Sequence, residues 1–346
     1  MSYAQMSAST LFTTPAKDRL REFLRLHPTE ADSLAIRHLT PDASTREYFR
    51  IPWRGKSAIA CVYPEPFDPA FHPYLDVSRL FAAADLPVPQ VYGSDGNAGV
   101  IVQEDLGDHQ LREVLQTATD EQSDQYHERA IQLIAEIQAA TQRSTDMNSI
   151  AARLAFDEAK LAWELGFFLE HYFVSHRGEK LSHGEAAELK VELNDIASEL
   201  AARPRVLCHR DYHTSNLMVD AAGVVRIIDH QDARMGPASY DLVSLLLDRR
   251  LSLPSLAQVR AYRLLFLDHR VERGLSRIDP DEFALEFRLM AVQRCLKAVG
   301  TFSYQTGVMG RTDYERFINP TLQIVGQSAE WLERFPALRR MINERI

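Results

Sequence analysis

The first third of the chain has the pattern of apolar and polar positions that is typical of a small sheet. Short runs rich in β-branched and aromatic residues predict strands within residues 48–51, 57–63 and 99–106. Turn-forming residues at 53–56 separate the first two runs, and apolar residues at helical spacing predict helices over 17–26 and 71–84. We therefore expect a small N-terminal sheet into which the second helix is inserted.

After residue 107 the pattern becomes helical. Amphipathic stretches predict helices over 109–118, 121–143, 151–173, 184–202, 254–271, 280–300 and 311–344. One β interruption covers 206–229, where two apolar runs flank the tight-turn residues 220–223. The pattern predicts a mixed α+β chain with an N-terminal lobe over 1–106 and a larger, mainly helical C-terminal lobe over 107–346, joined by a hinge near 104–107.

Composition narrows the class of protein. The 346 residues include 39 Lys and Arg against 48 Asp and Glu, a net charge of −9, and 45% of them are hydrophobic. This composition is typical of a folded chain of about two domains, and it excludes global disorder. Because an acidic chain without a long Lys or Arg run has no footprint for a polyanion, we expect no nucleic-acid partner.

The chain has no features of a membrane or secreted protein. No window approaches the ~18 consecutive apolar residues of a spanning helix, and the first residues lack the layout of a signal peptide. Cys61, Cys208 and Cys295 lie far apart without a CxxC pair, so neither a disulfide framework nor a zinc site is indicated. We expect a cytoplasmic monomer without a membrane partner.

The residues that carry chemistry gather within 206–241. A polar loop over 209–216 follows one short apolar run, and Asp229 ends the strand that returns from the tight turn. An aspartate on such a loop can accept a proton from a hydroxyl, while an asparagine five residues later and an aspartate on the neighbouring strand can hold Mg²⁺. Phosphoryl transfer needs mainly positioning and charge neutralisation, so we predict Asp211 as base and Asn216 and Asp229 as metal ligands.

Each of these residues also has a purely structural interpretation. Asp211 could cap a turn, Asn216 could be a turn residue, and Asp229 could be the polar end of a hairpin. Asp232 could join the metal or be a solvated carboxylate. We interpret His209 as a hydrogen-bonded structural histidine, because the role of base is already filled by Asp211.

The loop resembles the signature of protein kinases, in which His-x-Asp precedes an asparagine by five residues and a metal-binding aspartate follows. It is more similar to the aminoglycoside phosphotransferase and choline kinase family, because His213 stands two residues after the base and a Gly-Pro-x-x-x-Asp-Leu segment begins at Gly236. The resemblance implies a bilobal protein-kinase-like fold, ATP and Mg²⁺ as cofactors, and buried Asp241 as structural support of the loop.

In this resemblance the segment 42–50 takes the place of the loop that covers the nucleotide. It contains no glycine, and the resemblance implies that Ser44, Thr45 and Arg46 contact phosphate oxygens; a turn between strands is the alternative. Backbone groups of Glu104 and Leu106, in the hinge, would bind adenine. The resemblance thus assigns the N-terminal lobe to nucleotide binding and the C-terminal lobe to catalysis and acceptor binding.

One element of the family pattern is missing. The strand at 57–63 contains no lysine, although relatives carry one there for the α- and β-phosphates. Arg46, Arg50 and Lys56 are the candidates that could replace it.

The missing lysine, the Ser-Thr-Arg segment and the sequences at 101–107 and 227–233 together resemble bacterial anomeric kinases of N-acetylmuramate and N-acetylglucosamine, from about Leu39 to Asp248. This implies a small-molecule amino sugar as acceptor, phosphorylated at its C1 hydroxyl in cell-wall recycling. An aminoglycoside, choline or other small-alcohol kinase is the alternative, and a non-catalytic kinase-like binding protein is the second.

Choline would require an aromatic cage. Aromatic residues occur at helical spacings that could form a cage or a buried helix face: Trp163, Phe167, Phe168, Tyr172 and Phe173.

Overall fold

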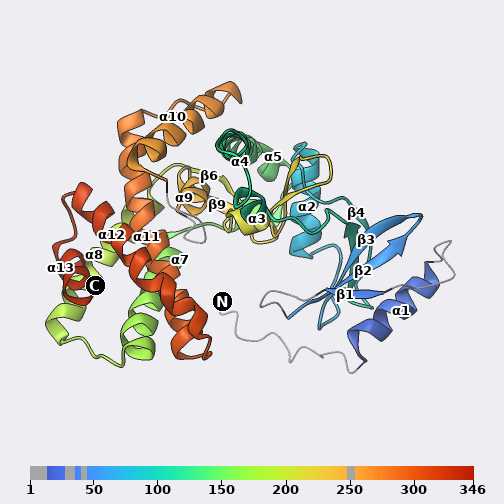
Figure 1. Ribbon diagram of the computed structural model, residues 1–346, viewed down its shortest axis with the longest axis horizontal. Helices are drawn as coiled ribbons and strands as arrows, with labels where there is room; N and C mark the ends of the chain where they lie inside the picture. Colours follow the sequence, from blue (N-terminus) through green and yellow to red (C-terminus); the bar gives the residue numbers. More distant parts are fainter. Residues whose placement is uncertain (1–13, 28–35, 40–44, 248–253) are drawn as a thin grey trace. The chain divides into compact units, whose positions relative to one another are not determined.

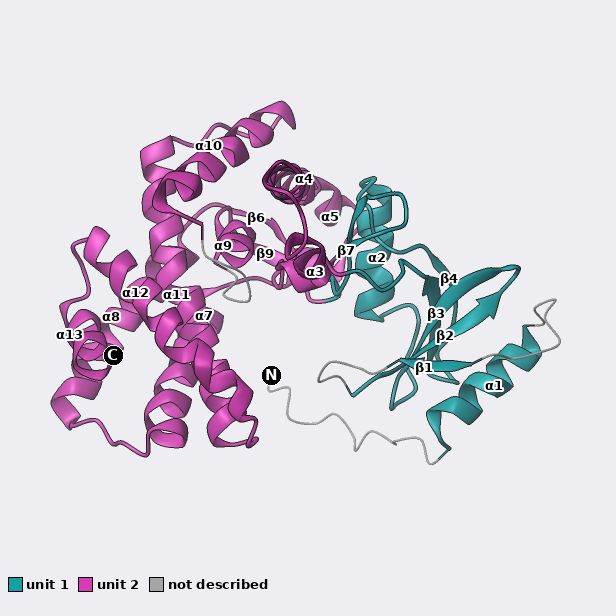
Figure 2. Ribbon diagram, in the orientation of Figure 1, with its two compact units in different colours: residues 1–109, 218–231 teal, residues 110–217, 232–346 magenta. Residues whose placement is uncertain are grey.

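The protein is described by a computed structural model over residues 14–27, 36–39, 45–247 and 254–346 (Figure 1). The chain divides into two compact units (Figure 2): unit 1 contains residues 1–109 and 218–231, and unit 2 contains residues 110–217 and 232–346. The hairpin that follows the polar loop therefore belongs with the N-terminal residues. The assignment of nucleotide binding to 1–106 and of catalysis to 107–346 remains a prediction.

Unit 1 is built on a five-stranded antiparallel sheet with the order β1-β2-β3-β5-β4. The strands are β1 (Arg37–Leu39), β2 (Glu47–Trp53), β3 (Lys56–Val62), β4 (Val91–Asp95) and β5 (Val100–Glu104). Trp53 pairs with Lys56, and the two residues between them have positive φ, the geometry of a tight hairpin turn. The turn predicted at 53–56 is confirmed.

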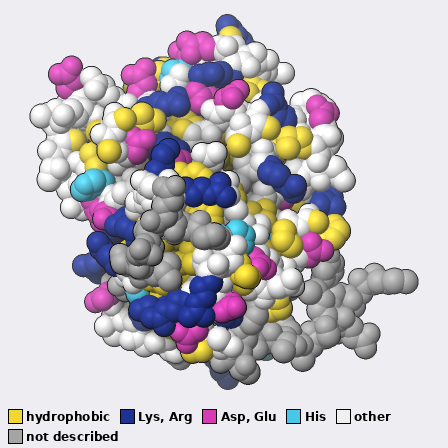
Figure 3. Space-filling model, turned by 90° about the vertical axis from the view of Figure 1, so that its right-hand side faces the viewer, with side chains coloured by type: hydrophobic (Ala, Val, Ile, Leu, Met, Phe, Trp, Pro, Cys, Tyr) yellow, Lys and Arg dark blue, Asp and Glu magenta, His cyan; other side chains and the backbone are white. Residues whose placement is uncertain are grey.

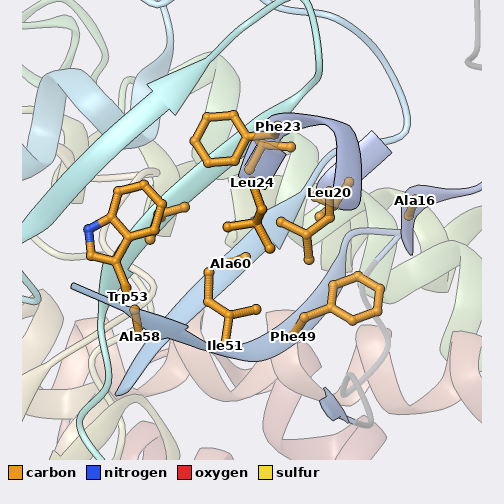
Figure 4. Close-up of a cluster of buried hydrophobic side chains, with 12 residues drawn as sticks. Ala16, Leu20, Phe23, Leu24, Phe49, Ile51, Trp53, Ala58 and Ala60 are labelled. Carbon is orange, nitrogen blue, oxygen red and sulfur yellow. The ribbon is translucent and has the colours of Figure 1, made fainter. Parts of the chain in front are cut away.

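One face of this sheet packs against α1 (Ala16–Leu26). In Figure 4, Leu20, Phe23 and Leu24 of the helix point toward apolar side chains of β2 and β3. The buried cluster comprises Ala16, Leu20, Phe23, Leu24, Phe49, Ile51, Trp53, Ala58, Ala60, Val62, Val100 and Val102. Burial of this apolar face fixes the register of the sheet, because a slip by one residue would turn these side chains to solvent.

The opposite face is covered by the inserted helix α2 (Pro73–Ala83). Successive residues of a strand point to opposite faces, and Ile101 lies between the two valines of the first cluster. Ile101 packs instead with Tyr74 and Leu75 of α2. The helix predicted at 71–84 is thus confirmed as the second layer of the unit.

The hairpin of unit 1 consists of β7 (Leu217–Val219) and β8 (Val225–Ile227). Asp220 accepts hydrogen bonds from the backbone N–H groups of Ala222 and Val224, both at 3.0 Å, and so closes the predicted turn. The hairpin is tied to the rest of unit 1 by two backbone bonds, Val219 N to His109 O and Ile227 N to Pro87 O, each 2.9 Å long.

Unit 2 is mainly helical. Its α-helices are α3 (Leu111–Leu115), α4 (Asp120–Ala139), α5 (Thr141–Asp146), α6 (Ile150–Arg153), α7 (Glu158–Phe168), α8 (His183–Ala201), α9 (Tyr240–Leu246), α10 (Leu256–Glu272), α11 (Pro280–Gly307), α12 (Ile318–Trp331) and α13 (Pro336–Arg345). A π-helix continues α7 over Leu169–His176, and 3₁₀ turns cover Thr214–Asn216 and Thr312–Phe317. The strands β6 (Arg205–Cys208) and β9 (Arg234–Pro237) form an antiparallel pair.

Three stretches predicted as single helices are interrupted. The stretch 121–143 breaks at Ala140, and 151–173 breaks where Phe156 donates its N–H to Met235 O, 2.8 Å away, beside β9. The stretch 311–344 breaks at Phe335, whose backbone is left-handed and which precedes a proline. Proline disfavours the helical conformation in the residue before it, so this last break has a local cause.

Helix α11 lies unusually close to α7 and the π-helix. A Cβ atom at Gly300 would lie 2.9 Å from the Cα of Phe168, so only glycine permits this approach. Lys297 lies one turn before Gly300, and Glu164 lies one turn before Phe168. The close packing therefore brings these two charged residues together in the interior of unit 2.

Three properties expected from the sequence can be examined in the described residues: surface charge, membrane-spanning helices and the burial of the cysteines. On the face drawn in Figure 3, basic side chains are interspersed with acidic ones. None of the helices in the described part of the chain is long and apolar enough to cross a membrane. All three cysteines are buried.

Candidate active site

The polar loop follows β6 directly, and its backbone is held by Asp241 at the start of α9. The side chain of Asp241 is fully buried and accepts the N–H of His209 at 2.6 Å and the N–H of Arg210 at 3.0 Å. Arg210 has a φ of 86°, a left-handed conformation that costs free energy in any residue with a Cβ atom. Arg294 of α11 donates to the Arg210 carbonyl oxygen at 3.1 Å. The loop is therefore fixed on both sides, the geometry that a supporting role of His209 and Asp241 requires; that role stays a prediction.

Asp211 follows the strained residue, and cations surround its carboxylate. Lys297 Nζ lies 3.8 Å from Oδ1, and Arg210 Nε lies 3.6 Å from Oδ2. Burial by itself would raise the pKa of Asp211, but the charges of Lys297, Arg210 and Arg294 hold that pKa below its ordinary value. The carboxylate is therefore ionised at neutral pH, as a group that accepts a proton must be.

Asn216 ends the 3₁₀ turn before β7. Its Nδ2 atom donates to the backbone oxygen of Asp211 at 2.9 Å, so the same loop fixes the predicted base and the Asn216 amide. Because the nitrogen is the donor in this bond, the amide oxygen is the atom with which Asn216 would bind a cation.

Asp229 lies in unit 1, two residues beyond β8, and its φ of 62° is also left-handed. Gln231 Nε2 donates to Oδ1 of Asp229 at 2.9 Å, and Arg46 Nη2 lies 3.8 Å from the same oxygen. Its side chain is 39% exposed, against 31% for Asp211.

The next residue, His230, anchors the backbone that follows β8. It is fully buried, its Nε2 lies 2.7 Å from Ser78 Oγ of α2, and its ring lies 5.0 Å from that of Tyr74 and 5.4 Å from that of Phe81. The packing of His230 on α2 holds the left-handed backbone of Asp229 in place.

The donor chemistry of the two predicted metal ligands fits Mg²⁺. Asn216 offers an amide oxygen and Asp229 carboxylate oxygens, which are the hard ligands that Mg²⁺ prefers together with phosphate and water. Among the described residues, no group of three or more His, Cys, Asp and Glu side chains could hold a metal ion. Asn216 belongs to unit 2 and Asp229 to unit 1.

The predicted phosphate-binding segment is described only in part. Ser44 lies outside the described residues, Thr45 is exposed, and Arg46 directly precedes β2. The Arg46 guanidinium lies 5.9 Å from the ring centre of Tyr48 and 5.8 Å from that of Tyr63, beside Asp229. This position keeps a permanent positive charge next to a predicted metal ligand.

The predicted hinge residues end β5. Glu104 donates its backbone N–H to Gln90 O at 2.8 Å, and its carboxylate receives Arg226 Nη2 at 2.7 Å. Leu106 is buried. The N–H of Glu104 is already bonded, so it is not available to donate to adenine, and its carbonyl oxygen is the group that would accept a hydrogen bond from the adenine amino group.

Arg50 is committed to the same hinge. It forms ion pairs with Asp105 at 2.7 Å and with Asp108 at 2.7 Å. Lys56 is exposed at the first position of β3, in the hairpin turn. Of the three candidates for the missing lysine, Arg46 is the one that lies beside Asp229.

Two charged residues near Asp211 escaped the sequence analysis. Glu164 of α7 is 1% exposed, and its Oε1 lies 3.9 Å from Lys297 Nζ. Glu164 interrupts the otherwise apolar stretch 161–169, and charged residues are almost never fully buried unless they are paired. That interruption was the only sequence signal, and it could not name the partner.

Comparison with known proteins places these features in a family. The model of the phosphotransferase enzyme family matches residues 35–279. The chain belongs to this family. The predicted resemblance is thus confirmed, and so is the prediction that the protein is an enzyme that transfers a phosphoryl group.

Two bacterial relatives of this phosphotransferase are both named N-acetylmuramate/N-acetylglucosamine kinase. The protein of Neisseria meningitidis is 29% identical over 312 residues, which cover 88% of this chain and 89% of the relative. The protein of Pseudomonas aeruginosa is 30% identical over 266 residues, 76% and 74% of the two chains.

The fold is shared with solved structures at low sequence identity. The crystal structure of choline kinase from Cryptosporidium parvum has a TM-score of 0.62 to the phosphotransferase at 10% identity, and the match covers 94% of this chain and 99% of that one. The predicted α+β, protein-kinase-like fold is confirmed.

Proposed function

We propose that the phosphotransferase moves the γ-phosphoryl group of ATP to the anomeric C1 hydroxyl of an amino sugar, N-acetylmuramate or N-acetylglucosamine. The observation that carries the choice of acceptor is the similarity to two relatives that bear this name and are aligned over three quarters or more of the present chain. In cell-wall recycling, such a reaction would return amino sugars as sugar 1-phosphates.

In this proposal Asp211 is the base. The acceptor oxygen attacks the γ-phosphorus, its proton passes to an Asp211 carboxylate oxygen, and the bond from phosphorus to the bridging oxygen of ADP breaks. The ionised and fixed carboxylate of Asp211 supports this role. Asn216 and Asp229 would hold Mg²⁺, which supplies neutralisation of phosphate charge when bound.

The nucleotide would be held by residues of unit 1. Arg46, with Ser44 and Thr45, would contact phosphate oxygens, and backbone groups of Glu104 and Leu106 would bind adenine. Arg46 is favoured over Arg50 as the replacement for the missing lysine, because Arg50 is held by two hinge carboxylates.

Two observations disfavour a cationic acceptor such as choline or an aminoglycoside. Phe168, Tyr172 and Phe173 are at most 1% exposed, so they belong to the core and cannot line an open cage. In addition, Lys297 and Arg210 lie within 4 Å of the Asp211 carboxylate and would repel a cation there.

The test is a screen of acceptor-dependent ADP release with N-acetylmuramate, N-acetylglucosamine, glucosamine, choline and kanamycin. We expect activity with the two N-acetyl sugars and a phosphorus NMR signal of an acid-labile sugar 1-phosphate. Activity confined to choline or kanamycin would reject the amino-sugar acceptor. Silence with all five acceptors, together with MgATP binding, would favour the non-catalytic alternative.

A further inference from the structure

The ammonium group of Lys297 lies between two carboxylates in the interior of unit 2. Its Nζ atom is 3.8 Å from Asp211 Oδ1 and 3.9 Å from Glu164 Oε1, and the side chain is 20% exposed. Both distances exceed a hydrogen bond, so the ammonium group acts on the two carboxylates through its charge. Lys297 belongs to no sequence motif identified above.

Glu164 is the fixed side of this arrangement. It is 1% exposed, and Gln293 of α11 donates to its Oε2 atom at 2.9 Å. Burial of a carboxyl group favours a cation beside it. Lys297 is that cation from α11, and Lys160 approaches the same Oε1 atom to 4.0 Å from the more exposed side.

The position of Lys297 matters for phosphoryl transfer. A carboxylate that takes the proton of the sugar hydroxyl lies close to the phosphoryl group during its transfer, and both groups are anionic. A fixed positive charge beside the carboxylate reduces their repulsion, and at 3.8 Å from Oδ1 the Lys297 ammonium group does so without taking up that oxygen in a hydrogen bond. Arg210 also lies beside the Asp211 carboxylate, at 3.6 Å, but its guanidinium group forms a shorter ion pair with Asp232 at 2.9 Å.

We propose that Lys297 is a positioning residue of the phosphoryl transfer. Glu164 holds Lys297 in place, and Lys297 orients the Asp211 carboxylate and offsets its charge. This rests on the proposed function of Asp211 as the base. Lys297 does not itself touch the nucleotide in this proposal, so its removal should change turnover and not nucleotide affinity.

The surroundings of Lys297 support a readout by pH. The groups that face it are Glu164 from α7, Arg210 and Asp211 from the loop after β6, and Arg294 from its own helix. Burial, and then the charge of Arg294, lower the pKa of Lys297 to about 8, although Asp211 and Glu164 oppose this. Lys297 should therefore lose its positive charge above about pH 8, whereas an arginine at this position would keep its charge.

The experiment compares Lys297→Met and Lys297→Arg with the wild type in steady-state assays with the best acceptor. For Lys297→Met we expect kcat to fall about 100-fold, with KM for ATP within about twofold of the wild type. For Lys297→Arg we expect most of the activity to return and the decline of kcat above pH 8 to move to higher pH. Thermal unfolding of each variant checks that it is folded.

Lys160→Met is the matched control, because Lys160 contacts Glu164 at nearly the same distance, whereas among the described residues the lysine that pairs with Asp211 is Lys297. We expect Lys160→Met to keep kcat within about threefold of the wild type. An equal loss in both methionine variants, or an unchanged kcat in a folded Lys297→Met, would overturn the proposal. A wild type that is silent with every acceptor would instead reject the proposed function, so the two failures are distinguishable.

Discussion

Unit 1 and unit 2 each hold one of the two proposed functional aspartates, and they bury different groups around it. Near Asp211, unit 2 packs acidic and basic side chains against one another, such as Glu164 at 1% exposure and Lys297 at 20%. Near Asp229, unit 1 buries the rings of His230, Tyr74 and Phe81, and the ion pair of Arg46 and Asp229 lies nearer the surface, at 22% and 39% exposure.

The difference matches what the two regions have to do in the proposed reaction. A base needs a fixed charge environment, which buried and mutually held ions provide. A group that binds phosphate must exchange its partners when the nucleotide arrives, and half-exposed ion pairs are weak enough to be exchanged. In both regions a left-handed, non-glycine residue stands at the key position, Arg210 in one and Asp229 in the other, and a buried neighbour holds it.

The largest expected effect is the contrast between the two aspartates themselves. Asp211→Asn should lower kcat by about 10²–10⁴-fold and leave MgATP affinity within about twofold, because it removes only the proton acceptor. Asp229→Ala should weaken MgATP binding at least about tenfold as well as lower the rate. Steady-state kinetics and calorimetric titration with MgATP measure both. If both variants lost MgATP affinity equally, the division of roles would be wrong.

The support of the catalytic loop comes next. Asp241→Ala leaves two buried N–H groups, of His209 and Arg210, without their acceptor, so we expect a loss of about 3 kcal/mol in the free energy of unfolding. Urea denaturation measures it. Asp232→Asn, at a carboxylate 46% exposed, is the control and should change stability by less than about 1 kcal/mol.

The buried His72 of unit 1 predicts a pH dependence of the free energy of unfolding of similar size. Burial and the charge of Arg46 lower the pKa of His72 to about 4. Between the ordinary histidine pKa of about 6.5 and that value, the unfolded chain binds more protons than the folded one, so stability falls as the pH falls. We expect His72 to contribute up to about 3 kcal/mol to this loss.

His72→Gln should therefore flatten the dependence of unfolding free energy on pH between 6.5 and 4. Denaturation curves at several pH values provide the measurement, with His38→Gln, whose side chain is 50% exposed, as the control. A slope that His72→Gln leaves unchanged would show that folding does not lower the pKa of His72.

The smallest effect concerns the anchor of Asp229. Ser78→Ala removes the hydroxyl that contacts the buried imidazole of His230 at 2.7 Å, so we expect a loss of about 1 kcal/mol in stability. Since the rings of Tyr74 and Phe81 still hold His230, MgATP affinity should change by less than about threefold. A large loss of MgATP affinity would mean that the Ser78 hydroxyl, and not the packing of the rings, holds His230 and Asp229 in position.

Much of the fold followed from local patterns. The hairpin turn at 53–56, the turn closed by Asp220 and the helices at 17–26 and 71–84 all formed as predicted, because each depends on neighbouring residues. The strand β4 was missed because its sequence, Val-Tyr-Gly-Ser-Asp, is only partly apolar and is a strand by virtue of pairing with β5. β9 likewise exists because Cys208 pairs with Arg234 across the chain.

The sequence by itself determined the family, the change from a strand-rich to a helix-rich part of the chain, and the candidates Asp211, Asn216 and Asp229. The candidates could be found because a loop motif has a fixed spacing along the sequence. Only the tertiary structure decided what surrounds Asp211. The approach of α11 to Phe168, which Gly300 permits, brings Lys297 to Glu164 across more than a hundred residues of chain. Charge at a distance of 4 Å depends on packing between helices, and no spacing along the sequence records it.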